Sequence, residues 1–319
     1  MTALATEPAS PAATPEIPAF LELEITGFCQ LTCTHCYADS GPRGGNGTMS
    51  ADDWEHVIDQ AAALGVRTVQ FIGGEPAIAP HFPRLMRHAL DAGLNVNVYS
   101  NLVRVNPPLW ELLTAPGVSL STSWYSADPA VHAQITGSRT AWTSTRANIA
   151  EATRRGSTVQ AAIIDGIVPG QDAAAAEAEL RAIGVTQIRI RPAQGVGRAA
   201  THGQHNDPSE LCGHCGTGRA AILPDGTFTP CVIGRWMHTG NVTETPIAEI
   251  LAGQAWRDAL DSVPRMADPC APECPPAMDG GDCPPASQPA CGPSYCAPDT
   301  GDTLGVLIPP AQATARQTG

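Results

Sequence analysis

Three closely spaced cysteines near the start of the chain are the residues best suited to chemistry. Cys29, Cys33 and Cys36 lie in the segment Cys-Gln-Leu-Thr-Cys-Thr-His-Cys, directly after the alternating apolar stretch 20–26. A 4Fe-4S cluster that only carries electrons takes four cysteine thiolates. Three thiolates leave one iron without a protein ligand, and an open iron is able to bind a substrate or a cofactor. The spacing therefore indicates a catalytic cluster.

Two other interpretations of these cysteines carry less weight. A structural zinc site needs a fourth Cys or His at ordinary ligand spacing, and only His35 is near, in an awkward position inside the triplet. A disulfide suits a secreted chain. Residues 1–19 are rich in Ala, Pro and Thr, however, and lack the basic start and apolar run of a signal peptide. We expect this segment to be a disordered leader.

A glycine-rich acidic segment, Gly-Gly-Glu-Pro at 73–76, follows the second expected strand. Together with the CxxxCxxC run and the apolar strand before it, this segment resembles the radical S-adenosylmethionine (SAM) superfamily. The resemblance implies that the amino and carboxylate groups of SAM chelate the open iron, and that the reduced cluster cleaves the sulfonium to give a 5′-deoxyadenosyl radical. It also implies that Gly73, Gly74 and Glu75 receive the methionine amino group and that Tyr37 flanks the adenine.

Polar residues at later strand ends complete the expected cofactor site. The resemblance implies that groups such as Asn101 and Ser123 hold the ribose or the carboxylate of SAM, although a solvated strand end is an equal alternative. Arg189 and Arg191 alternate with two isoleucines, so both point to one side of the sixth expected strand. If that side is the barrel interior, Arg191 binds a carboxylate; the alternative is a pair that faces solvent.

Short apolar strands alternate with amphipathic helices between Phe20 and Arg191, which is typical of βα units around a parallel sheet. Strands are expected at 20–26, 66–72, 94–99, 118–124, 158–164 and 186–191, and helices at 50–64, 81–92, 107–114, 143–155 and 172–183. The fold class is therefore α/β, a partial (β/α)6 TIM-like barrel within residues 20–200. Parallel barrels carry active sites at the C-terminal ends of their strands, where the cysteines and the glycines fall.

Expected helix ends agree with this pattern. Ser50 and Asp53 have the spacing of a capping box. Glycines stand where the helices should stop, at Gly65, Gly93, Gly156 and Gly184.

A second cysteine group follows the barrel and predicts a small cysteine-rich β-hairpin and loop domain at 206–300 that binds iron-sulfur clusters, with a flexible tail at 301–319. Cys215, ten residues, Gly226, four residues and Cys231 resemble the opening of the SPASM or twitch extensions of radical SAM enzymes. A Pro-Asp-Gly turn predicts a hairpin at 220–231, and a helix is expected at 246–261. The expected auxiliary ligands are Cys212, Cys215, Cys231, Cys270, Cys274, Cys283, Cys291 and Cys296.

The number of auxiliary clusters stays open at this point. Eight cysteines equal two sets of four, but the gaps after Cys270 are three, eight, seven and four residues, which departs from the SPASM pattern. One auxiliary 4Fe-4S cluster with spare thiols is the alternative to two.

Composition excludes several classes of function. All 18 basic residues are arginine, so lysine-based Schiff-base chemistry and a P-loop lysine are excluded. The formal net charge of −13 argues against a nucleic-acid partner, because that affinity comes from basic residues that neutralise phosphates. No apolar run is long enough to cross a bilayer. Eleven cysteines without an export signal favour metal ligation in a cytoplasmic protein.

The substrate is inferred from the resemblance alone. Short radical SAM proteins with SPASM-like extensions most often crosslink, epimerise or oxidise peptides, so our first hypothesis is maturation of a ribosomally synthesised peptide. Residues 1–19 are too short for a leader-binding domain, and a separate leader-binding protein is then a partner. The alternative is dehydrogenation, epimerisation or decarboxylation of a sugar, aminocyclitol or nucleoside. A metal-carrying protein without catalysis is a third class. We expect an electron donor such as flavodoxin or ferredoxin.

Overall fold

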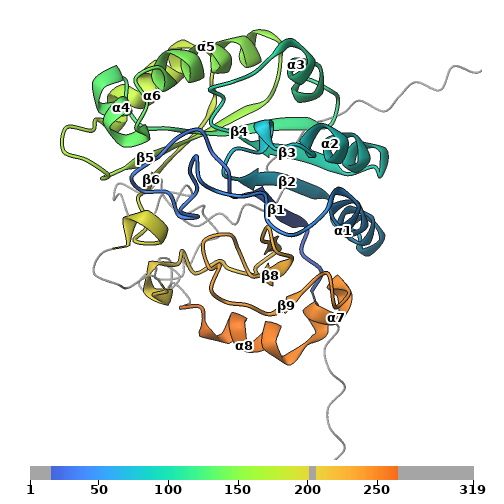
Figure 1. Cartoon of the computed structure of the whole chain (residues 1–319). Coiled ribbons are helices and arrows are strands. Elements are labelled where there is room, and N and C mark those ends of the chain that lie inside the picture. Colours follow the sequence, from blue (N-terminus) through green and yellow to red (C-terminus); the bar gives the residue numbers. More distant parts are fainter. Residues whose placement is uncertain (1–15, 201–205, 265–319) are drawn as a thin grey trace, which may run out of the picture.

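The computed structural model describes residues 16–200 and 206–264, and in this part of the chain nine strands form one sheet (Figure 1). The strand order is β6-β5-β4-β3-β2-β1-β7-β8-β9, and neighbours from β6 to β7 are parallel. The strands are β1 (Phe20–Thr26), β2 (Thr68–Gly73), β3 (Asn95–Tyr99), β4 (Val118–Trp124), β5 (Val159–Asp165), β6 (Gln187–Pro192), β7 (Arg219–Ile222), β8 (Thr227–Thr229) and β9 (Gly240–Asn241). The predicted open partial barrel is confirmed.

Helices connect the parallel strands and cover one face of the sheet (Figure 1). They are α1 (Ala51–Leu64), α2 (Phe82–Asp91), α3 (Pro107–Leu113), α4 (Pro129–Thr136), α5 (Ala141–Arg154) and α6 (Ala173–Ala182), with short 3₁₀ helices η1 (Pro76–Ile78), η2 (Gly197–Ala199) and η3 (Pro208–Glu210). Of the described residues, no helix has both the length and the apolar character needed to span a membrane.

Helix termini follow the predicted signals. The Ser50 side chain accepts from the backbone of Asp53 while the Asp53 carboxylate accepts from the backbone of Ser50, which is the predicted capping box. The four predicted glycines all adopt positive φ values directly after or near their helices. Helix α4 was not predicted; it begins after Asp128, whose side chain accepts from the Ala130 backbone N–H.

The two faces of the sheet differ in polarity. Toward the helices, strand residues such as Leu21, Phe71 and Val98 are fully buried in the main hydrophobic core. The opposite face carries buried polar side chains on adjacent strands, where Gln70 donates to Asn97 at 2.7 Å and Asn97 donates to Ser119 at 2.8 Å. Buried polar groups need such partners. This polar face is what a bound substrate or cofactor would meet.

The segment after residue 206 joins the same sheet. Strand β7 pairs in parallel with β1, and β7 and β8 form the predicted antiparallel hairpin with Gly226 at φ 85° in the turn. The single helix predicted at 246–261 is wrong: α7 (Ile247–Ala252) and α8 (Gln254–Ser262) are separated by Gly253 at φ −70° and ψ 157°. The break lets Trp256 of α8 pack edge-on against Phe228 of β8.

Candidate active site

The cysteine loop follows β1 directly and is held by backbone hydrogen bonds from both sides. Cys29 N–H donates to the Gly41 carbonyl at 3.1 Å, and the backbone N–H groups of Thr32 and Thr34 donate to the carbonyls of Thr136 and Ile135 in the last turn of α4. Cys29 is buried, while Cys33 and Cys36 are partly buried. The structure therefore brings the three predicted ligands together at the C-terminal end of the first strand.

Donor groups point at the sulfurs of this loop. The backbone N–H of Leu31 lies 3.4 Å from the Cys29 Sγ, and that of Ser40 lies 3.3 Å from the Cys36 Sγ. Burial raises the pKa of Cys29 to about 12 and of Cys33 to about 11. Metal binding must displace these protons, and the N–H donors then stabilise the thiolates.

The three thiols of this loop lie within eight residues of one another at the end of β1. In a cubane cluster each thiolate binds a different iron at its own corner, so the sulfurs do not converge on one point. The donor set thus fits a 4Fe-4S cluster with three protein ligands.

The two glycines of the 73–76 segment pack against the start of the cysteine loop. A Cβ at Gly73 would lie 2.3 Å from the Thr26 carbonyl oxygen, and one at Gly74 would lie 2.1 Å from the Phe28 carbonyl oxygen. Gly74 N–H also donates to Thr26 at 2.7 Å. Glycine is therefore required at both positions because the backbone of the cysteine loop lies so close. The contact of these glycines with SAM stays a prediction.

Glu75 is buried and its carboxylate is fully engaged by the protein. It accepts hydrogen bonds from the backbone N–H groups of Ala77 at 3.1 Å and Asn101 at 2.7 Å and from the Ser100 hydroxyl at 2.7 Å. Burial raises the pKa of Glu75 to about 7, although the three hydrogen bonds act to lower it. This carboxylate fixes the loop after β3 next to the loop after β2.

Asn101 links that loop to the cysteines. Its side-chain oxygen accepts from Gln30 at 2.9 Å, and its Nδ2 lies 3.7 Å from the Cys29 Sγ. The structure thus gathers Glu75, Asn101 and Cys29 at adjacent strand ends, as predicted from their positions. The assignment of Asn101 to SAM stays a prediction.

The remaining predicted cofactor residues lie on or beside the polar face. Tyr37 is partly buried, with the Arg235 guanidinium 6.0 Å from its ring centre, and its buried hydroxyl has no partner among the described residues. Ser123 shares a 3.0 Å hydrogen bond with the Tyr99 hydroxyl. Arg191 lies exposed on β6, paired in register with Ile164. Because Ile188 packs on the helix side, both β6 arginines belong to the polar face.

His35 lies inside the cysteine loop and is largely shielded from solvent. Its ring contacts Tyr125 edge-on at 5.0 Å between centroids. Burial lowers the pKa of His35 to about 4, so the imidazole is neutral at physiological pH.

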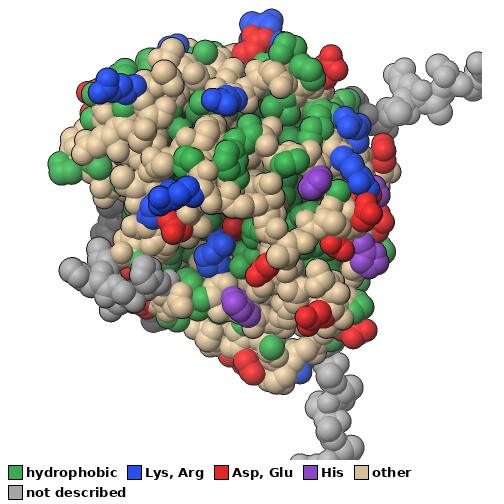
Figure 2. Space-filling model, in the orientation of Figure 1, with side chains coloured by type: hydrophobic (Ala, Val, Ile, Leu, Met, Phe, Trp, Pro, Cys, Tyr) green, Lys and Arg blue, Asp and Glu red, His purple; other side chains and the backbone are tan. Residues whose placement is uncertain are grey.

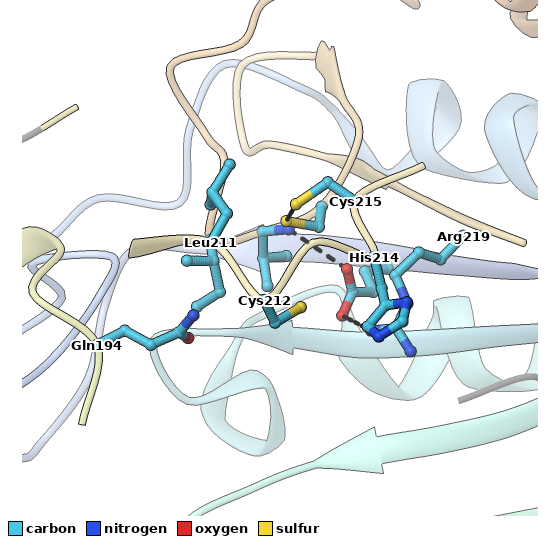
Figure 3. A pocket seen from close by; sticks show the side chains of 10 residues that line it. Gln194, Leu211, Cys212, His214, Cys215 and Arg219 are labelled. Carbon is cyan, nitrogen blue, oxygen red and sulfur yellow. Dashed lines mark hydrogen bonds and ion pairs between the residues drawn. The ribbon is translucent and has the colours of Figure 1, made fainter. Parts of the chain in front are cut away.

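Three of the eight downstream cysteines fall in the described segment. Cys215 and Cys231 are buried with their sulfurs 3.0 Å apart, and Gly234 N–H donates to the Cys231 sulfur at 3.2 Å. Cys212 and His214 precede Cys215 on one short segment and line the same pocket (Figure 3). The other predicted ligands, Cys270, Cys274, Cys283, Cys291 and Cys296, lie outside the described residues.

Two arginines that sequence reasoning missed hold the cysteine loops in place. Arg198 donates to the carbonyls of Cys33 at 2.8 Å and Ser40 at 2.7 Å. Arg235 donates to both carboxylate oxygens of Glu24 on β1. For the pair of Arg235 and Glu24, the sequence offered one indication. Glu24 stands in an alternating apolar strand, and an acidic residue at such a position predicts that one face of the sheet is polar.

Comparison with known proteins decides the family. Residues 23–180 match the family model described as the Radical SAM superfamily, and residues 212–275 match SPASM, an iron-sulfur cluster-binding domain. The chain belongs to the radical SAM superfamily. The cofactors of this radical SAM protein are 4Fe-4S clusters and SAM, which agrees with the donor sets of both cysteine loops.

Individual relatives are similar over part of their length. The chain is 33% identical over 133 residues to an AdoMet-dependent heme synthase of Methanosarcina barkeri and 31% identical over 140 residues to a PqqA peptide cyclase of Xanthomonas campestris pv. campestris. These matches cover 41% and 44% of this chain, but only 38% and 37% of the relatives. The fold is similar to that of Streptococcus suis SuiB bound to precursor peptide SuiA, with a TM-score of 0.65, 14% identity, and coverage of 77% of this chain and 67% of SuiB.

Proposed function

We propose that this chain is a radical SAM enzyme that matures a ribosomally synthesised peptide. When bound, the reduced cluster and SAM supply a 5′-deoxyadenosyl radical that abstracts hydrogen from an unactivated C–H bond. Crosslinking, epimerisation and oxidation of a side chain all begin with such an abstraction.

The observation that carries the proposal is that both cysteine loops meet the same strand. Cys29 begins its loop at the end of β1, and the loop after Cys231 bonds back to β1, where Val232 N–H lies 3.3 Å from a Glu22 carboxylate oxygen. Each loop aims N–H groups at sulfur. A substrate on the polar face would thus lie between two iron-sulfur sites.

The residues of this chain divide into three roles in the proposal. Cys29, Cys33 and Cys36 hold the catalytic cluster. The backbone of Gly73 and Gly74, with Tyr37, Asn101, Ser123 and Arg191, contacts SAM, whereas Glu75 positions the neighbouring loops. Cys212, Cys215 and Cys231 hold an auxiliary cluster together with cysteines from the 270–296 segment.

A peptide is favoured over a small molecule by two similarities. One relative is a PqqA peptide cyclase, and SuiB was solved with its precursor peptide. Within residues 16–200 and 206–264, the sheet also ends at β6 without closing, because β6 pairs with β5 alone in the strand order of this part of the chain. An open barrel side gives an extended chain access to the polar face. The proposal includes a low-potential electron donor, a separate leader-binding protein and a cytoplasmic location.

The test uses the reconstituted full chain and a short peptide encoded beside its gene. Incubation with SAM and dithionite should convert the peptide to a product of changed mass, with 5′-deoxyadenosine in proportion. With the peptide deuterated at the reacting carbon, the label should appear in 5′-deoxyadenosine. An unmodified peptide, together with turnover of a sugar, aminocyclitol or nucleoside, would contradict the peptide proposal and establish the small-molecule alternative.

A further inference from the structure

An open groove lies beside the cysteine loop, on the side of the sheet away from the polar face. It runs between η1, the loop after β3, and helices α3 and α5, and its walls include Ile78, Val103, Arg104, Leu109 and Ala147. Figure 2 shows hydrophobic side chains at the surface over α2, α3 and α5, which are labelled in Figure 1. The groove is open to solvent.

One layer of side chains separates this groove from the catalytic cysteines. Val103 lines the groove and also packs against the small buried group formed by Cys29, Leu31 and Ala141, which Cys33 contacts as well. Asn101, two residues before Val103, reaches the Cys29 sulfur. Because electron tunnelling weakens steeply with distance, a surface this close to the cysteines is a suitable entry point for electrons.

Two exposed arginines are close in sequence to that buried group. Arg104 directly follows Val103, and Arg139 lies two residues before Ala141. Neither guanidinium makes a hydrogen bond or ion pair within residues 16–200 and 206–264, whereas the exposed arginines Arg84, Arg154 and Arg181 are all paired. Arg104 lines the groove, and Arg139 lies just before α5, whose Thr143 and Ser144 also line it. In a chain of net charge −13, two arginines without a partner among the described residues favour an acidic partner at this place.

Three acidic residues on the adjoining loops are engaged by other groups of the protein. Glu75 is buried and engaged by three protein donors. Asp128 is used as the N-cap of α4. Asp39 is paired with Arg198 at 2.8 Å.

We propose that the groove flanked by Arg104 and Arg139 is the docking site of an acidic one-electron carrier protein. The inference rests on the proposed function, because that chemistry consumes electrons at the cluster held by the three cysteines. The docked carrier is oxidised by one electron, that cluster is reduced by one electron, and no atom is transferred. The polar face stays free, so a substrate and the carrier bind on opposite sides of the cysteine loop.

Charge reversal with a matched control tests this surface. The variants are Arg104→Glu, Arg139→Glu and the double variant. Arg87→Glu is the control, because Arg87 is exposed on α2 and unpaired among the described residues. A purified acidic flavodoxin is the probe. We would measure the rate of cluster reduction by reduced flavodoxin in stopped flow, and the affinity of oxidised flavodoxin by calorimetry, both at low ionic strength.

The double variant should slow reduction by flavodoxin about tenfold and weaken its binding, since electrostatic steering changes association rates about 10- to 1,000-fold and is lost at high salt. The control should stay near wild type. Photoreduced 5-deazaflavin, which needs no docking site, should reduce all variants equally. Wild-type rates and affinity in the double variant, or no binding to the wild type, would overturn the proposal. A deazaflavin-reduced enzyme that forms no 5′-deoxyadenosine would instead contradict the proposed function.

Discussion

Arg235 donates two hydrogen bonds to the buried carboxylate of Glu24, at 2.9 and 3.1 Å. Glu24 lies on β1 before the catalytic cysteines, and Arg235 follows Cys231 by four residues. The same guanidinium covers the ring of Tyr37, which directly follows Cys36. Burial raises the pKa of Glu24. Burial alone would lower the pKa of Arg235, but the attraction of Glu24 is stronger and raises it. This pair connects the two cysteine loops.

Breaking the Glu24 and Arg235 pair should destabilise the protein strongly. Removing one partner leaves an uncompensated buried charge, which costs about 3–5 kcal/mol. We therefore expect Glu24→Gln and Arg235→Gln each to lower the unfolding free energy by this order, measured by denaturant titration of the anaerobic, cluster-loaded protein. The double variant should lose less than the sum of the two. Additive losses would show that the residues are not coupled. Arg154→Gln is the control, because Arg154 pairs with Glu151 on the surface. This variant should change the unfolding free energy little.

Glu75 should make stability depend on pH. Its pKa is raised from 4.5 to about 7 by burial, so between these values the folded protein holds a proton that the unfolded chain has released. This contribution to stability is full below about pH 4.5 and is lost as the pH rises through about 7, at about 1.4 kcal/mol per pKa unit. Thermal unfolding between about pH 5 and pH 8 should show a steeper fall for the wild type than for Glu75→Gln. Parallel curves would contradict this assignment.

Gly74→Ala should disrupt the contact between the glycine segment and the cysteine loop. The added Cβ would lie 2.1 Å from the Phe28 carbonyl oxygen, and relieving such a clash costs about 1–3 kcal/mol. We expect lower stability and a lower iron content after reconstitution. At Gly93, where a Cβ meets nothing within 4 Å, alanine should cost only the strain of a positive φ, about 1–2 kcal/mol. Equal losses at both positions would mean that the close packing is unimportant.

Arg198 should position the cysteine loop. Its guanidinium bonds the carbonyls of Cys33 and Ser40 and the exposed carboxylate of Asp39. Arg198→Gln removes the two loop contacts, so the cluster should be lost faster to an iron chelator, followed by absorbance. Asp39→Asn keeps those contacts and should behave as wild type. If both variants lost the cluster at the same rate, the bonds from Arg198 to the two carbonyls would not be what holds the loop.

Local patterns were enough to predict the barrel, whereas contacts between distant residues were not. Alternating apolar residues located β1 to β6, and glycines marked helix ends, because both signals act within a few residues. The bond from Arg198 to Cys33 joins residues 165 apart, and that from Arg235 to Glu24 joins residues 211 apart. Nothing in the local sequence of either arginine shows its partner. Helix α4 was missed, and the break at Gly253 depends on how Trp256 packs.

Production of 5′-deoxyadenosine from SAM tests the central claim most directly. The reconstituted full chain, reduced with dithionite under anaerobic conditions, should form 5′-deoxyadenosine even without a substrate, and the variant with Cys29, Cys33 and Cys36 changed to Ala should form none. Iron analysis of that variant should still find about four irons for one auxiliary cluster or about eight for two. Wild-type protein with a full complement of iron that leaves SAM intact would contradict the account.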